Sequence, residues 1–166
     1  LSLVGSEMCI RDSIYTLSTE KLAIFRRRQI GLIYQFFNLI PTLNVEENIT
    51  LPCELDGQTV DKKRLDKLID ELGLNGRKTH LPEELSGGQQ QRVSIGRALI
   101  NRPAIVLADE PTGNLDKKNS DEIVELLRRA NQEYRQTIIM ITHNLEIAKT
   151  ADRVIVIEDG KIIREG

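Results

Sequence analysis

Two adjacent carboxylates, Asp109 and Glu110, directly follow the apolar run IVLA and are well placed to do chemistry. A short apolar run of this kind is typical of a buried parallel strand, and open α/β sheets bind ligands at the carboxyl ends of such strands. One carboxylate there can hold magnesium while its neighbour orients or deprotonates an attacking water. Because an isolated acidic pair after a strand is more often a solvated loop, Asp109 and Glu110 need support from other motifs.

A second candidate site is the turn Ser86-Gly87-Gly88, which precedes the helical pattern QQQRVSIGRALI. The small residues leave the first backbone N–H groups of the helix approachable. A helix N-terminus also carries partial positive charge, so the turn predicts a phosphate site. By itself, a Ser-Gly-Gly sequence is usually only a turn.

Short apolar runs and amphipathic segments alternate along the chain and predict a parallel α/β core. The predicted buried strands are residues 30–34, 104–108 and 137–142. A later strand within 152–158 is followed by a hairpin turn at Asp159-Gly160. Amphipathic helices are expected over 61–72 and 117–134. Residues 36–52 are expected to be a loop, and its apolar side chains either meet a partner or pack inside a helical subdomain.

The ordered set of motifs resembles ABC-type ATPases. LSGGQQQR resembles their signature motif, IVLADEP their Walker B segment and GNLD their D-loop. Each motif alone is only a hypothesis, but the set in this order is far more specific. The resemblance begins at Ile14. Within the family, the chain is similar to the ATPases of macrolide exporters, lipoprotein-releasing complexes and bacitracin-type resistance systems.

The resemblance implies a role for each candidate residue. Glu110 would be the catalytic base or water-orienting residue, and His143, at the end of the strand 137–142, would contact the γ-phosphate. Asp109 and the Q-loop glutamine, Gln35, would be magnesium ligands. The remaining nucleotide-binding positions would be Ser86, Gly87, Gly88 and Gln89 of the signature motif, together with Asp116 of the D-loop, which would couple two ATP sites.

The fold implied by the resemblance is the P-loop NTPase fold of an ABC-type nucleotide-binding domain: an α/β domain with a helical subdomain at about 38–95 inserted in the parallel sheet core. The cofactors implied are ATP and Mg²⁺. A homodimer would hold two ATP molecules, each against the signature motif of the other subunit. A permease in the plasma membrane would hold the dimer at its cytoplasmic face.

The phosphate-cradling part of such a domain has no counterpart in these residues. A P-loop needs the pattern GxxxxGK[ST] between a strand and a helix, and none of the eleven glycines begins it. We therefore expect residues 14–166 to be an N-terminally truncated domain that neither hydrolyses ATP nor folds well alone, with part of its sheet uncovered. Residues 1–13 are expected to be an unrelated, artefactual leader.

Composition narrows the alternatives. The net charge of −2 argues against non-specific binding of nucleic acid, and two cysteines without metal-ligand spacing fit a reducing compartment.

A DNA-maintenance ATPase of the SMC type shares these motifs but carries long coiled coils between the Q-loop and the signature motif. Another alternative is a non-catalytic partner that donates its signature motif in trans.

Overall fold

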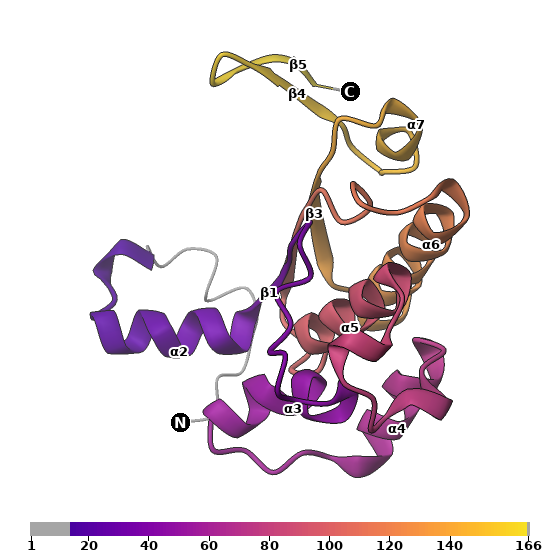
Figure 1. The fold of residues 1–166 in the computed structure, drawn as a ribbon. Helices are drawn as coiled ribbons and strands as arrows, with labels where there is room; N and C mark the ends of the chain where they lie inside the picture. The colour runs from indigo at the N-terminus through magenta and orange to yellow at the C-terminus, as the bar shows by residue number, and fades with distance from the viewer. Residues whose placement is uncertain (1–13, 166) are drawn as a thin grey trace.

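The computed structural model of this chain describes residues 14–165 (Figure 1). Residues 1–13, which carry the predicted leader, lie outside the described residues. The elements in chain order are η1 Ile14–Thr16, α2 Thr19–Gln29, β1 Ile30–Ile33, α3 Val45–Leu55, α4 Lys62–Glu71, η2 Asn75–Arg77, η3 Pro82–Glu84, α5 Gly87–Leu99, β2 Ile105–Asp109, α6 Lys117–Tyr134, β3 Thr137–Ile141, α7 Leu145–Ala148, β4 Ile155–Glu158 and β5 Lys161–Glu165.

Strands β1, β2 and β3 form a parallel sheet in that order, as the strand and helix alternation predicts. Ile33 pairs with Ala108, which in turn pairs with Met140, so the three strands end close to one another. The strand ends lie within one residue of the predicted positions. The parallel α/β core is therefore confirmed.

Strands β4 and β5 pair in an antiparallel hairpin that is a separate sheet. Its turn is Asp159-Gly160, where both residues have positive φ, 48° and 74°. Two successive left-handed residues are typical of a type I′ turn, whose twist matches that of the flanking strands. The predicted hairpin is confirmed, and Figure 1 shows it with α7 at the far end of the molecule from α3 and α4.

One face of the parallel sheet is covered by helices α5 and α6, whereas α2 lies on the other side (Figure 1). Val106 and Ala108 are fully buried on the covered face. Gly31 of β1 lies so close to α5 that a Cβ added there would be 2.6 Å from the carbonyl oxygen of Ala98. A glycine in β1 thus sets how near the sheet and α5 approach.

The opposite face of the sheet carries exposed apolar side chains. Leu32, Ile139 and Ile141 are 44%, 50% and 62% exposed. The register places Leu32, Leu107 and Ile139 across the three strands on this one face. The expectation that part of the sheet is uncovered is confirmed for residues 14–165.

Helix α3 was not expected, because residues 36–52 predicted a loop. Asn44 caps it: its side chain accepts from the N–H of Glu47, and the Glu47 carboxylate accepts from the N–H of Asn44. This capping box and the burial of Ile49 against α5 outweigh Pro52, which removes one hydrogen bond inside the helix. The apolar residues of the segment thus pack within the domain to a large extent.

Helix α4 is amphipathic as predicted, with Leu65, Leu68 and Ile69 buried. These residues and those of α3 belong to one continuous apolar core with α5, α6 and the sheet. The boundaries of a helical subdomain at 38–95 stay a prediction. Among the helices of residues 14–165, none combines the length and apolar character needed to cross a membrane.

Candidate functional site

Glu110 and His143 meet at the ends of β2 and β3. The Glu110 Oε1 atom accepts a hydrogen bond from the backbone N–H of His143 at 2.9 Å and lies 2.7 Å from its ring Nδ1. The backbone N–H of Glu110 donates to the carbonyl of Ile141, the last residue of β3. Glu110 also has a left-handed backbone (φ 44°), rare outside glycine, which turns the chain directly after the strand.

The two side chains differ in their access to water. The Glu110 side chain is 19% exposed and that of His143 81% exposed. With the proton of His143 on Nδ1, the ring donates to Oε1 and its Nε2 can accept. The second carboxylate oxygen, Oε2, makes no hydrogen bond to residues 14–165. An oriented carboxylate with one free oxygen is the arrangement that a general base or a water-positioning residue needs.

Gln35 lies at the same edge of the sheet, two residues after the end of β1. Its carbonyl accepts a hydrogen bond from the side chain of Asn114 at 3.0 Å. Its side-chain amide packs so closely on Gly113 that a Cβ added to Gly113 would be 2.9 Å from Nε2. Gln35 thus lies against the turn that follows Glu110.

Asp109 is the last residue of β2, and its side chain is exposed at this edge. The oxygens of Asp109 and Gln35 are the hard donors that Mg²⁺ prefers, and magnesium–nucleotide sites use only one or two carboxylates besides phosphate and water. Within the described part of the chain, no group of three or more His, Cys, Asp or Glu could hold a metal. Asp109 and Gln35 thus offer the donor chemistry of such a site, and their role as magnesium ligands stays a prediction.

The signature turn forms the N-terminus of α5. The Ser86 hydroxyl accepts from the N–H of Gln89 at 3.3 Å, and the Gln89 side chain accepts from the N–H of Ser86 at 2.9 Å. This capping box fixes the start of the helix and involves the amides of Ser86 and Gln89, not those of Gly87 and Gly88. Gly87 is exposed whereas Gly88 is buried, and the binding of an anion by their amides stays a prediction.

Asp116 caps α6. Its Oδ1 accepts from the backbone N–H of Asn119 and its Oδ2 from the Asn119 side chain, each at 2.8 Å. The hydrogen bond from the Asn119 backbone, and after it the one from the Asn119 side chain, hold the pKa of Asp116 below its usual value. A Cβ on Gly88 would be 2.6 Å from Asn119 Oδ1, so the signature turn and Asp116 both contact Asn119. The cap explains the position of Asp116, and its role in coupling two ATP sites stays a prediction.

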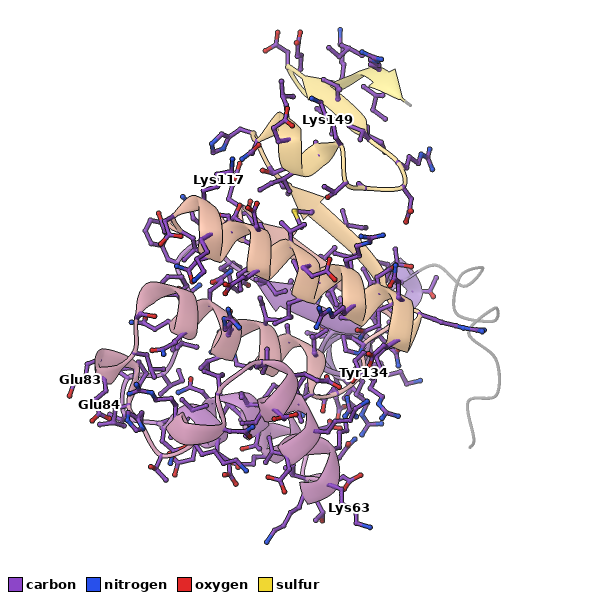
Figure 2. All side chains as sticks on the ribbon, turned by 90° about the vertical axis from the view of Figure 1, so that its right-hand side faces the viewer. Lys63, Glu83, Glu84, Lys117, Tyr134 and Lys149 are labelled. Atoms are coloured by element: carbon purple, nitrogen blue, oxygen red, sulfur yellow. The ribbon has the colours of Figure 1, made fainter. Side chains whose placement is uncertain are left out.

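The structure thus brings the predicted site residues together in two groups. Gln35, Asp109, Glu110 and His143 share the carboxyl edge of the parallel sheet. Ser86, Gly87, Gly88, Gln89 and Asp116 lie at the N-termini of α5 and α6. Lys117 marks the start of α6 in Figure 2, on the side of α7 and the hairpin, whereas Tyr134 lies at the other end. The segment after Gln35 joins the groups, because a Cβ on Gly87 would be 3.7 Å from the Phe37 ring.

Four further residues hold this site and were not predicted. Gln91, Arg97 and Asn114 bind carbonyls of the segment 34–38, and Asn119 joins the signature turn to Asp116. The hydrogen bonds of Gln91, Arg97 and Asn114 join residues that are 57 to 79 positions apart along the chain. Contacts so distant leave no local pattern, although the Asp116 to Asn119 spacing is that of a helix cap.

A protein-family model described as ABC transporter matches residues 2–113. The match includes the Q-loop, the signature turn and the Asp109-Glu110 pair. It also begins within residues 1–13, and the proposal that these are an unrelated leader stays a prediction. Because the match covers more than half of the chain, it shows the family.

Curated relatives and solved structures agree with this match. The macrolide export ATP-binding/permease protein MacB of Brucella melitensis is 46% identical over 156 residues, 93% of this chain and 24% of its own. The lipoprotein-releasing system ATP-binding protein LolD 1 of Chlorobium luteolum is 43% identical over 158 residues, 94% of this chain and 67% of its own.

Among solved structures, the ATP-binding cassette MJ0796, as a dimer bound to ADP and Pi, has a TM-score of 0.80 and 39% identity. The match covers 91% of this chain and 68% of that one. The chain spans only 64% of the length of two other curated relatives. With its parallel α/β core and the ordered Q-loop, signature and Walker B motifs, this chain belongs to the ABC transporter family of ATP-binding proteins.

Proposed function

We propose that this chain is the ATP-hydrolysing motor subunit of an ABC transporter, driving export or release of a peptide, lipid-linked or antibiotic-type compound through a partner permease. The hydrogen bonds between Glu110 and His143 at the ends of neighbouring strands carry the proposal. The names of two relatives, a macrolide exporter and a lipoprotein-releasing ATPase, support the substrate class.

In this proposal, Glu110 accepts a proton from the attacking water through Oε2 while His143 holds Oε1 in place. His143 also presents its exposed ring to the γ-phosphate. Asp109 and Gln35 would hold a magnesium ion, which neutralises charge on the phosphate oxygens when it is bound. The amides of Gly87 and Gly88 would bind the nucleotide of a second subunit.

The assembly proposed is a homodimer that holds two ATP molecules and binds a permease at the cytoplasmic face of the plasma membrane. The similar structure of MJ0796 is a cassette dimer bound to ADP and Pi, which supports a dimer here. A protein contact beside the Q-loop would use the exposed aromatic side chain of Phe36, next to Gln35.

We also propose that the 166 residues do not hydrolyse ATP alone. The backbone amides and lysine of a P-loop cradle the β- and γ-phosphates, and no residues of this sequence fit that pattern. Without them, Glu110 has no held substrate on which to act.

The test joins the strand, P-loop and helix of MJ0796 to the chain before Ile14. The 166-residue chain should show no turnover, and this restored cassette should hydrolyse ATP. Replacing one general base costs about 10²–10⁴ in rate, so Glu110→Gln in the restored cassette should lower kcat by that factor. Glu83→Gln removes an exposed acid on η3 and is the control (Figure 2). Turnover by the 166-residue chain that Glu110→Gln abolishes would refute the proposed inactivity.

The alternative is a non-catalytic partner that lends its signature turn to a complete subunit. The bonded Glu110 and His143 pair argues against it, because such a partner needs neither side chain. Mixing the chain with a P-loop-bearing cassette separates the two possibilities. A gain in turnover that Ser86→Arg removes, while Glu110→Gln does not, would favour the non-catalytic partner.

The SMC-type alternative is disfavoured by the fold. Between Gln35 and Ser86 the chain forms only two regular α-helices, α3 and α4, of 11 and 10 residues. Both pack into the domain core. A coiled-coil arm would need several heptads with free apolar seams in this interval.

A further inference from the structure

Arg97 joins the last turn of α5 to the segment that follows Gln35. Its Nη1 donates to the carbonyl of Asn38 at 2.7 Å, and its Nη2 donates to the carbonyl of Phe37 at 3.0 Å. Asn38 has a left-handed backbone (φ 48°), which asparagine tolerates better than most residues. One guanidinium thus binds two successive carbonyls.

Arg97 makes these bonds without a carboxylate partner. Its side chain is partly buried, and burial lowers the pKa of Arg97 from its ordinary value. None of the ion pairs within residues 14–165 involves it. A guanidinium removed from water must find other acceptors, so the two carbonyls compensate for its lost hydration.

Two more side chains hold the same segment. Gln91, fully buried on α5, donates to the carbonyl of Tyr34 at 3.4 Å, and Asn114 donates to the carbonyl of Gln35 at 3.0 Å. Four of the five carbonyls of segment 34–38 therefore accept hydrogen bonds from side chains far away in the sequence. The backbone around Gln35 is fixed largely by α5 and by the turn after Glu110.

We propose that Arg97 is a positioning residue that fastens the segment carrying Gln35 to α5, so that Gln35 and the signature turn move together. The proposal rests on the proposed function, in which these two features contact different nucleotides. Helix α5 runs unbroken for 13 residues from the signature turn past Arg97. A displacement of its Ser86 end is therefore passed to the segment carrying Gln35 through the side chains of Arg97 and Gln91.

The phenylalanines offer a direct test, because the chain has only Phe25, Phe36 and Phe37. The 166-residue chain is labelled with 4-fluorophenylalanine, and its ¹⁹F NMR spectrum is recorded with trimethylamine N-oxide added to favour the folded state. Arg97→Met should shift and sharpen the Phe36 and Phe37 signals and leave Phe25, on α2, unchanged. Arg97→Lys, which keeps the charge but has no fork of donors, should give an intermediate spectrum and remains informative if Arg97→Met does not fold.

Arg64→Met is the matched control. Arg64 is also partly buried and donates to one backbone carbonyl, that of Leu99, but it lies on α4 and holds no part of segment 34–38. Its substitution should leave Phe36 and Phe37 in place. The proposal is overturned if Arg97→Met leaves both signals unchanged, or if Arg64→Met moves them equally.

The same substitutions in the restored cassette test the consequence for the reaction. A displaced group near the chemistry can cost up to about 10² in rate, so we expect Arg97→Met to lower kcat about tenfold or more, with KM for ATP within about twofold. Arg64→Met should leave kcat unchanged, and equal kcat for the two variants would overturn the proposal. If the unsubstituted cassette hydrolyses no ATP, the proposed function fails, while the ¹⁹F spectra still decide the role of Arg97.

Discussion

Gly31→Ala is the substitution whose effect the structure defines most closely. Gly31 lies in β1 opposite Val106, on the sheet face that α5 covers. A methyl group there would be 2.6 Å from the carbonyl oxygen of Ala98 and 3.1 Å from Cγ of Pro103. Neither neighbour can rotate away, because one is helix backbone and the other a proline ring. The sheet and α5 must therefore separate.

The magnitude follows from two opposing effects. Forcing an extra methyl group into a packed core costs about 1–3 kcal/mol. Alanine also restricts the unfolded chain more than glycine does, which returns about 0.4–1 kcal/mol. The free energy of unfolding should therefore fall by about 1–2 kcal/mol. With a urea m-value of about 2 kcal/mol/M, the midpoint should fall by about 0.5–1 M.

The assay is urea unfolding followed by circular dichroism, with trimethylamine N-oxide added to raise the baseline stability. Gly76→Ala is the control, because a Cβ at Gly76 meets nothing within 4 Å and its φ is not positive. That variant should unfold at the same or slightly higher urea concentration. Equal midpoints for Gly31→Ala and Gly76→Ala, with unchanged m-values, would show that the close approach of β1 and α5 does not limit stability.

Two further substitutions test other contacts. Asn48 donates from Nδ2 to the carbonyls of Ile40, Leu43 and Asn44. Asn48→Asp replaces the donor with an acceptor and should lower the free energy of unfolding by about 1–3 kcal/mol at pH 7, whereas an unchanged urea midpoint would contradict this. The pKa of folded Asp116 lies below that of the unfolded chain, so its contribution to stability is complete above the unfolded pKa of about 3.9 and is lost as the pH falls through the folded value. Asp116→Asn should therefore flatten the loss of stability below about pH 4, and identical acid unfolding curves for the two proteins would be evidence against this role.

The sequence predicted those parts of the fold that depend on residues close together along the chain. The three apolar runs became β1 to β3, and the Asp159-Gly160 pair became the hairpin turn. The order of motifs also predicted that Glu110 and His143 share one edge of the sheet, because the carboxyl ends of parallel strands meet there.

Helix α3 was missed because Pro52 and the β-branched residues around it argue against a helix. The capping box of Asn44 and Glu47 was the signal that could have corrected this. Arg97 was missed for a different reason. Its partners are backbone carbonyls 59 and 60 residues away. Every residue has a backbone carbonyl, so no residue type in the sequence marks these two as acceptors.

The uncovered face of the parallel sheet also governs how this chain behaves in concentrated solution. Within residues 14–165, β3 is an edge strand of the parallel sheet and carries Ile139 and Ile141, so exposed apolar side chains and unpaired backbone groups occur together. Such an edge is a template for strand pairing between molecules. The net charge is only −2, and the isoelectric point is about 5.8, so electrostatic repulsion between molecules is weak. Turbidity should therefore rise with concentration and be greatest near pH 5.8.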